Sequence, residues 1–208
     1  MQIILEKISK KFNYEWIFRN VDYTFNSGEA YVILGSNGSG KSTLMQIVGG
    51  NLLSTSGSIK HVDGDNHEIP SDLLYRHVSI SAPYLEVIEE FTLPEILEFH
   101  RKFKPFRNNL TDSQIIEITG LTKVRNKPIR YFSSGMKQRV KLALAILSDT
   151  KVVLLDEPSS NLDKQGVEWY QELVAYNLAD RIFIVCSNSQ GHEYSYCTQQ
   201  LQIGDFKK

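Results

Sequence analysis

The hydrophobic positions of the chain fall into short uninterrupted runs and into periodic patterns. Runs of four or five apolar residues occur at 30–34, 152–155 and 182–185. Such runs are typical of strands that are buried on both faces, as in a parallel sheet. Apolar and polar residues alternate at 21–25, which predicts a strand with one exposed face. Further strands are predicted at 3–8, 59–62 and 78–81.

Helical periodicity and capping residues predict helices between these strands. Thr92 precedes one helical segment, with Pro94 in its first turn, and Thr111 forms a capping box with Gln114 before another. A long helix with a broad apolar face is predicted toward the end of the middle section. The predicted helices span 42–48, 93–100, 111–118, 136–147 and 164–177.

The order of these elements favours an α/β fold. Strands that alternate with helices are typical of a three-layer domain with a largely parallel sheet. The first third is rich in strands and the middle is helical, so we predict one domain with a helical lobe inserted into it. The expected bounds are 1–83 and 150–208 for the core with its β subdomain, and 84–149 for the lobe.

Charge and composition exclude several classes of protein. The net charge of −1 gives no basic field for nucleic acid, so we expect no nucleic-acid partner. Cys186 and Cys197 fit no metal-binding spacing, and Cys186 ends an apolar run, which predicts a buried free thiol in a reducing compartment. No run approaches the roughly 18–20 apolar residues of a membrane span, and because the first residues are charged we expect no signal peptide.

A glycine-rich loop lies between the predicted strand at 30–34 and the helix that follows it. It fits the phosphate-loop pattern G-x-x-x-x-G-K-[ST] in the strand–loop–helix setting that phosphate binding requires. Lys41 is expected at the β- and γ-phosphates and Ser42 at Mg²⁺. The alternative is a glycine- and serine-rich turn that binds nothing. The expected nucleotide-binding residues of the loop are Gly35, Ser36, Asn37, Gly38, Ser39, Gly40, Lys41, Ser42 and Thr43.

A pair of carboxylates follows the predicted strand at 152–155. Asp156 is an acceptor that can hold Mg²⁺, and Glu157 points elsewhere and can polarise an attacking water. The alternative is a solvated strand end. Because four hydrophobic residues precede the pair and Pro158 follows it, we favour the chemical interpretation.

Three further stretches and one aromatic residue resemble the ATPase domains of ABC transporters. Residues 132–139 (FSSGMKQR) resemble the L-S-G-G-Q signature, 152–158 the Walker B strand, and 160–163 (SNLD) the D-loop. Phe12 occupies the place of the aromatic residue that stacks on adenine. The resemblance covers essentially the whole chain. It implies a P-loop NTPase core with a mainly parallel sheet, an N-terminal antiparallel β subdomain and an inserted helical lobe.

The resemblance also implies roles for residues outside the phosphate loop. Ser133 and Gly135 are expected to contact the γ-phosphate held by the opposite subunit, although a helix N-cap is compatible with the same residues. Asp163 is expected to order the dimer seam, with an N-cap as the alternative. Phe12 is expected to stack on adenine, although Tyr14 or Trp16 could take that role instead. The other alternative for Phe12 is a place in the hydrophobic core.

Two departures from the family pattern affect catalysis. Ala82 or Pro83 stands where a glutamine is usual, and neither side chain can hydrogen-bond Mg²⁺ or water. Asn188 stands where a histidine is usual; it can donate to a γ-phosphate but cannot take up a proton near neutral pH. His192 lies four residues later and is an alternative, although a surface histidine is the more ordinary interpretation. Ser134 and Met136 are milder departures, within the signature.

These residues predict the ATP-binding and ATP-hydrolysing subunit of a membrane transporter, with slow turnover. Glu157, Lys41 and Asn188 are the expected catalytic residues, Ser42 and Asp156 the expected metal ligands, and ATP and Mg²⁺ the expected cofactors. The resemblance implies a head-to-tail homodimer with two ATP at its interface, located in the cytoplasm on the inner face of the membrane.

A permease on a separate chain is the expected partner, docked near 84–90, a segment whose alternative is packing in the lobe core. The competing function is an ATP-dependent switch with little hydrolysis. A DNA-maintenance ATPase is disfavoured because the chain has no heptad stretch.

Overall fold

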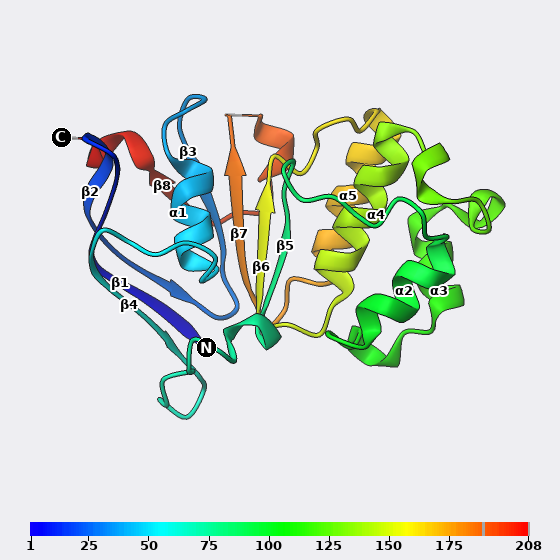
Figure 1. Ribbon diagram of the computed structural model, residues 1–208, viewed down its shortest axis with the longest axis horizontal. Helices are drawn as coiled ribbons and strands as arrows, with labels where there is room; N and C mark the ends of the chain where they lie inside the picture. Colours follow the sequence, from blue (N-terminus) through cyan, green and yellow to red (C-terminus); the bar gives the residue numbers. More distant parts are fainter. Residues whose placement is uncertain (189, 208) are drawn as a thin grey trace.

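A five-stranded parallel sheet lies at the centre of the computed structural model, which describes residues 1–188 and 190–207 (Figure 1). The strand order is β5-β6-β7-β3-β8, and every neighbouring pair is parallel. The predicted parallel sheet is therefore confirmed. Its strands are β3 (Ala30–Leu34), β5 (Val78–Ser81), β6 (Val152–Asp156), β7 (Ile182–Ser187) and β8 (Gln199–Gln202).

The N-terminal strands form a separate antiparallel sheet. Its order is β2-β1-β4, with β1 (Gln2–Phe12) between β2 (Glu15–Asn26) and β4 (Ser56–Val62). The turn between β1 and β2 falls at residues 13–14, between Phe12 and Trp16. The expected antiparallel subdomain is therefore confirmed.

The helices occupy both faces of the parallel sheet (Figure 1). Helix α1 lies between the two sheets, while α4 and α5 cover the opposite face and α2 and α3 pack outside them. This arrangement is the expected three-layer core with a helical lobe beside it; the bounds proposed for the lobe stay a prediction. The helices are α1 (Lys41–Val48), α2 (Leu93–Arg101), α3 (Asp112–Thr119), α4 (Ser134–Leu147) and α5 (Lys164–Ala175).

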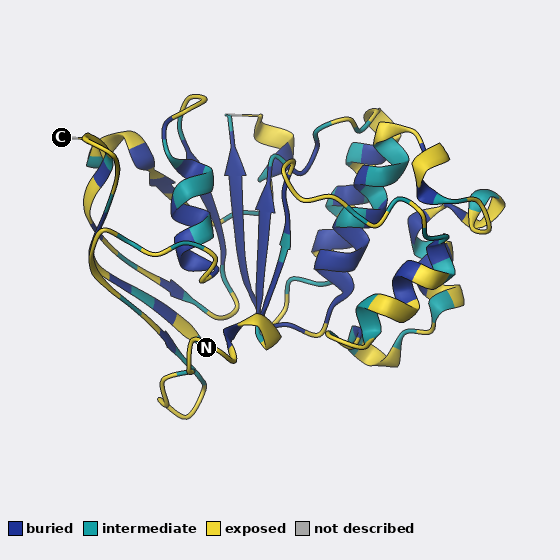
Figure 2. Ribbon diagram, in the orientation of Figure 1, coloured by how far each residue is buried: buried dark blue, intermediate teal, exposed yellow. Residues whose placement is uncertain are grey.

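The parallel sheet is shared by two hydrophobic cores. Along β6, Val152 and Leu154 pack with α1 and the antiparallel sheet, while Val153 and Leu155 pack with α4 and α5. This division follows from the two-residue repeat of strand side chains. All four side chains are fully buried, and Figure 2 shows the central strands as the most continuously buried part of the fold.

Capping residues set the helix starts as the sequence predicts. The N–H of Gln114 donates to the Thr111 hydroxyl at 3.3 Å, and the Gln114 side chain accepts from the Thr111 N–H at 2.9 Å. Thr92 forms the same reciprocal pair with Glu95. Each pair satisfies backbone donors that a helix start leaves unpaired.

Several predicted bounds are wrong, and one strand was missed. The N-terminal strands are longer than predicted, because β1 was expected at 3–8, β2 at 21–25 and β4 at 59–62. Helix α4 begins at Ser134, and α5 ends at Ala175, two residues before the predicted end. Strand β7 ends at Ser187, two residues beyond the apolar run at 182–185. Strand β8 has only one buried residue, Leu201, so its sequence carries no apolar run.

Cys186 is a buried free thiol, as expected, and Cys197 is also a free thiol. Within residues 1–188 and 190–207, no helix has both the length and the apolar character needed to cross a bilayer.

Candidate functional site

The glycine-rich loop connects the end of β3 to the first residue of α1. Gly40 has a φ of 105°, and a Cβ there would lie 2.5 Å from Cγ2 of Ile17. At Gly35 a Cβ would lie 2.5 Å from the Ser39 hydroxyl. Gly40 is therefore required both for its backbone conformation and for the lack of space, and Gly35 for the lack of space alone. Because the loop runs directly into a helix start, its N–H groups form a ready anion site.

Lys41 folds back across this loop. Its ammonium donates to the carbonyl oxygens of Gly35 at 2.8 Å and Ser36 at 3.1 Å. A third bond goes to Oδ1 of Asn188 at 2.5 Å. The side chain is only 5% exposed, so its charge is directed into the loop.

The ends of β6 and β7 place three polar side chains beside the loop. Asp156 is buried, and the N–H of Glu157 donates to the carbonyl of Cys186 at 3.0 Å. Asn188 follows β7 directly, and its Nδ2 donates to Oε1 of Glu157 at 2.6 Å. Asn188 thus connects the lysine of the phosphate loop to the glutamate that follows β6.

Asp156 and Ser42 form the candidate metal position. Burial raises the pKa of Asp156, a hydrogen bond from Ser42 acts against this shift, and the nearby charge of Glu157 adds to it. A hydroxyl and a buried carboxylate are oxygen donors of the kind that Mg²⁺ prefers. A divalent cation here would also relieve the repulsion between the carboxylates, so these residues fit the expected ion.

A cavity of about 290 Å³ lies over the phosphate loop. Glu157 from the end of β6 and Ile17 from β2 line it, together with Asn37, Gly38, Ser39, Gly40, Lys41, Ser42 and Thr43. Phe12 does not line it. That side chain is 47% exposed on β1, with the Lys10 ammonium over its ring at 4.9 Å, so the alternative that places Phe12 in the core is wrong.

Ile17 is a site residue that sequence reasoning missed. It lies five residues beyond Phe12, on the returning strand of the same hairpin, and its side chain touches the phosphate loop at Gly40. The signal for it was weak, because a single isoleucine in a strand is ordinary core composition.

The family model described as "ABC transporter" matches residues 18–160, more than two thirds of the chain. The chain belongs to the ABC transporter family. It is 30% identical over 80% of its length to the uncharacterized ABC transporter ATP-binding protein YcbN of Bacillus subtilis. It is also 30% identical, over 88% of its length, to the lantibiotic transport ATP-binding protein SrtF of Streptococcus pyogenes. The chain spans about half of YcbN (54%) and 78% of SrtF.

The fold is that of solved ABC cassettes. The dimeric structure of the bacterial ABC transporter cassette MJ0796 superposes with a TM-score of 0.79, 21% identity and coverage of 97% of this chain and 95% of that one. A structure of the same cassette in a post-hydrolysis state with ADP and Pi has a TM-score of 0.81. At this identity the likeness establishes the fold of the ABC nucleotide-binding domain.

The segment after β5 carries the departure from the family pattern that the sequence predicts. Ala82 is buried and Pro83 is exposed, and neither offers a polar side chain. Tyr84 follows them. Burial raises the pKa of Tyr84 to about 12, and the charge of Asp156 adds to the shift. Sequence reasoning had assigned Tyr84 only to a docking segment.

The signature and D-loop residues of this ABC domain lie away from the cavity of the same chain. Ser133 caps α4 by accepting from the N–H of Met136 at 3.3 Å, and Asp163 caps α5 by accepting from the N–H of Gly166 at 2.7 Å. A Cβ at Gly135 would lie 2.8 Å from the carbonyl oxygen of Asn161, so the signature packs against the D-loop. The predicted caps are confirmed, and the roles across a dimer stay predictions.

His192 does not replace the missing histidine at the cavity. It lies exposed in the short 3-10 helix Gly191–Glu193, and its Nε2 is 3.0 Å from the hydroxyl of Ser159.

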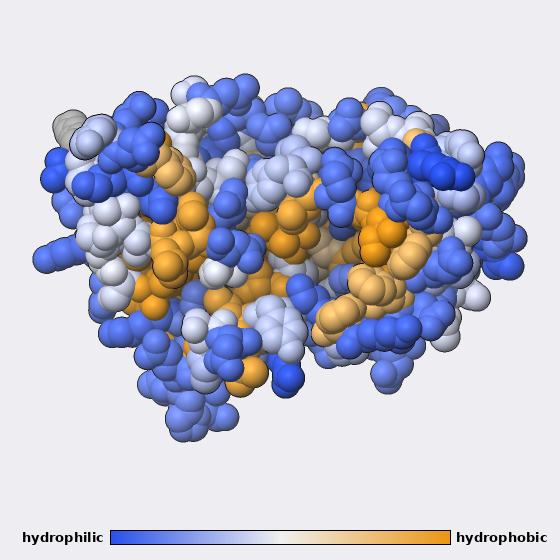
Figure 3. Space-filling view, viewed as in Figure 1, coloured by the Kyte–Doolittle hydropathy of each residue, from blue (hydrophilic) through white to orange (hydrophobic). Residues whose placement is uncertain are grey.

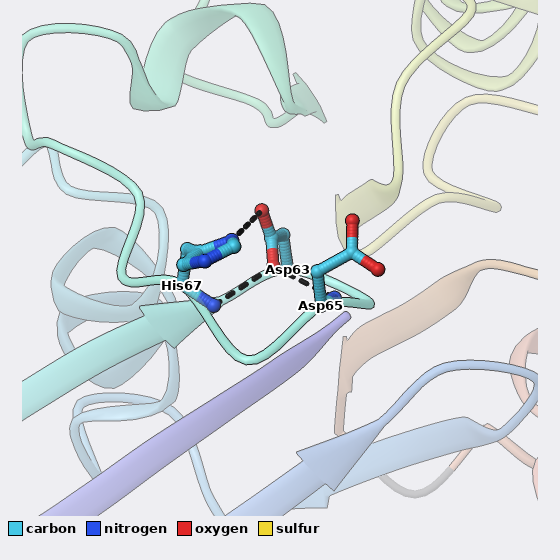
Figure 4. A group of neighbouring side chains, drawn as sticks. All are labelled: Asp63, Asp65 and His67. Atoms are coloured by element: carbon cyan, nitrogen blue, oxygen red, sulfur yellow. Dashed lines mark hydrogen bonds and ion pairs between the residues drawn. The ribbon is translucent and has the colours of Figure 1, made fainter.

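A separate group of possible ligands occupies the loop after β4 (Figure 4). Oδ1 of Asp63 accepts from the backbone N–H groups of Asp65 and His67, both at 2.9 Å. Its Oδ2 lies 3.7 Å from the ring of His67. Asp65 and His67 are exposed, and the hydrogen bonds of Asp63 account for the cluster as an ordinary turn.

Proposed function

We propose that the chain is the ATP-binding and ATP-hydrolysing subunit of a membrane transporter, with slow turnover. The observation that carries the proposal is the position of Glu157 in the wall of the phosphate-loop cavity, joined through Asn188 to Lys41. The names of YcbN and SrtF, both ATP-binding proteins, support the assignment of the nucleotide.

The phosphates bind in the loop. The N–H groups at the start of α1 and the ammonium of Lys41 supply positive charge at the β- and γ-phosphates. Ile17 supplies an apolar wall to the same cavity. Phe12 remains our proposal for the residue that stacks on adenine, because it lies on the same hairpin as Ile17.

Ser42 and Asp156 would hold Mg²⁺. When bound there, the ion offsets the negative charge on the phosphates. Ser42 lowers the pKa of Asp156 against the effect of burial, which is consistent with the two oxygens lying close together.

Glu157 acts on the attacking water. Its carboxylate accepts the proton of the water, while Asn188 holds the carboxylate in place through Oε1. Asn188 can donate to a γ-phosphate oxygen but cannot relay a proton, and Ala82 and Pro83 offer no donor. Losing one transition-state donor typically costs about 10²–10³ in rate, which is the basis for slow turnover.

Two copies of the chain would act head to tail. The signature residues Ser133 and Gly135 lie outside the cavity of their own chain, so they are available to the γ-phosphate in a partner copy, with Asp163 at the seam. MJ0796 forms a dimer with the same fold. Each site would then be complete only when ATP joins the two copies.

The permease would dock beside β5. A cavity of about 240 Å³ there is lined by Leu85 and Val87, and by Ser81, whose buried hydroxyl has no hydrogen-bond partner among the described residues. Tyr84, Leu85 and Ile88 are each more than a third exposed, which supports a surface role for the segment more than a place in the lobe core. On the visible face, hydrophobic side chains gather around a hollow near this segment (Figure 3). Docking there would place the chain in the cytoplasm, on the inner face of the membrane.

The same geometry also supports the second candidate, an ATP-dependent switch with little hydrolysis. Asn188 bonds to both Lys41 and Glu157 and cannot take up a proton near neutral pH, which favours a site that holds nucleotide with little hydrolysis.

Steady-state hydrolysis of Mg²⁺-ATP and light scattering, on the parent and on Glu157→Gln, separate the two candidates. For an ATPase we expect slow parent turnover and a variant that loses turnover and accumulates as an ATP-bound dimer. Glu168→Gln, which makes the same change at an exposed position, should behave as the parent. A parent that dimerises with ATP and does not hydrolyse it would favour the switch.

A further inference from the structure

One buried carboxylate lies outside the phosphate-loop cavity. Glu193 ends the 3-10 helix Gly191–Glu193 and is 2% exposed. Among the described residues, no lysine or arginine forms an ion pair with it. Burying a carboxylate is costly unless donors surround it, so its hydrogen bonds indicate what it does.

The carboxylate joins two segments of the chain. Oε1 of Glu193 accepts from the N–H of Ser159 at 3.2 Å and from its hydroxyl at 2.7 Å. Oε2 accepts from the hydroxyl of Ser187. The hydroxyl of Tyr170 in α5 donates to the carbonyl of Glu193 at 2.9 Å, which fixes the residue against a helix.

Both segments lead directly to the catalytic residues of the proposed function. Ser187 ends β7 and precedes Asn188, while Ser159 follows Glu157 by two residues. The backbone hydrogen bond from the N–H of Glu157 to the carbonyl of Cys186 is the last between β6 and β7. Glu193 links the two segments that follow these strands, just beyond that bond. The side chains of Asn188 and Glu157 meet at the same place.

We propose that Glu193 is a positioning residue for ATP hydrolysis. It holds the segments that follow β6 and β7 at a fixed separation, and this keeps the amide of Asn188 on the carboxylate of Glu157. Packing alone does not require a carboxylate here, because an apolar side chain fills such a space without the cost of burying charge. The inference rests on the proposed function.

A double-mutant cycle tests whether Glu193 influences hydrolysis through Asn188. Steady-state hydrolysis of Mg²⁺-ATP is measured over a range of ATP concentrations for the parent, Glu193→Ala, Asn188→Ala and the double variant. We expect Glu193→Ala to lower kcat about tenfold with KM within about threefold, and to cost less than about twofold when Asn188 is already alanine. A cost of the same size in both backgrounds would show that Glu193 does not act through Asn188.

A second measurement needs no nucleotide. The side-chain amide of Asn188 gives a ¹H–¹⁵N signal that is assigned by its loss in Asn188→Ala. We expect this signal to shift in Glu193→Ala and also in Glu193→Asp, which keeps the charge but is too short to reach both serines. Glu168→Gln should leave the signal unchanged, and thermal unfolding identifies any variant that does not fold.

The two proposals fail in different ways. A parent without hydrolysis overturns the proposed ATPase and leaves the amide signal as the test of positioning. An Asn188 signal that does not move in folded Glu193→Asp overturns the positioning role, whatever the turnover.

Discussion

The side-chain amide of Asn188 donates to Oε1 of Glu157 at 2.6 Å, directly beside the phosphate-loop cavity. Its oxygen accepts from Lys41 at the same time, so one neutral group bridges a cation and an anion. A histidine at this position could carry a proton between them, whereas an amide can only hold them in place. This difference leads to the first prediction.

Replacing Asn188 with alanine should lower single-turnover hydrolysis by about 10², the usual cost of one transition-state donor. Mg²⁺-ATP affinity should not weaken, because the loop, Lys41 and Asp156 remain. Phosphate release and binding of a fluorescent ATP analogue measure the two quantities. Asn51→Ala, an exposed asparagine, is the control. Hydrolysis unchanged in Asn188→Ala would remove the amide from the mechanism.

Two glycines of the phosphate loop should respond differently to alanine. At Gly38 (φ 73°) a Cβ meets nothing within 4 Å, so we expect a loss of about 1 kcal/mol from the left-handed backbone alone. At Gly40 the Cβ also meets Ile17 at 2.5 Å, and we expect at least twice that loss, with weaker ATP binding. Urea unfolding gives the comparison. Equal losses would mean that Ile17 moves aside freely.

Two serines on β5 form a second matched pair. Both are 2% exposed, but the Ser79 hydroxyl bonds to the carbonyl of Ala145 at 2.7 Å and to Thr150 at 2.8 Å, whereas the Ser81 hydroxyl has no described partner. Ser79→Ala should lower the free energy of unfolding by about 1–2 kcal/mol. Ser81→Ala should leave it unchanged or raise it. Chemical denaturation of both variants is the measurement, and a clear loss in Ser81→Ala would contradict the prediction.

His100 should make the fold sensitive to mild acid. Burial lowers the pKa of His100 from 6.5 to about 4, with Lys104 and Arg101 adding to the shift. The unfolded chain therefore binds more protons between these values, and stability falls as the pH drops through this window, by at most about 3 kcal/mol.

His100→Gln keeps a hydrogen-bonding group for Ser148 and should remove most of this decline in urea unfolding between pH 7 and 4.5. His67→Gln, at a mostly exposed position, should retain the decline of the parent. A decline that persists unchanged in His100→Gln would assign the acid sensitivity to other groups.

The strands and helices that position the phosphate loop were predictable because their signals are local. Apolar runs mark β3, β6 and β7. Thr92 followed by Pro94 marks one helix start, and the capping box at Thr111 marks another. Strand β8 was missed because it lies at the edge of the sheet, where the strand has a neighbour on one side only and buries only Leu201.

The side-chain contacts inside the site could not be predicted from local sequence signals. Asn188 was identified as a candidate from its place in the motif order, but its bridge between Glu157 and Lys41 joins residues 31 and 147 positions apart in sequence. Ile17 and Glu193 carry no motif at all. Their roles depend on which segments the fold brings together, and no periodicity in the sequence encodes such contacts.

Lys41 has three N–H protons, and three protein oxygens accept them: those of Gly35, Ser36 and Asn188. A phosphate oxygen that approaches the ammonium must therefore compete with an acceptor already present. At this lysine the arrival of ATP is an exchange of one hydrogen bond for another, and its contribution to affinity is the difference between two acceptors. The oxygens that already accept from Lys41 thus compete with phosphate for its ammonium, and removing one of these hydrogen bonds should tighten nucleotide binding.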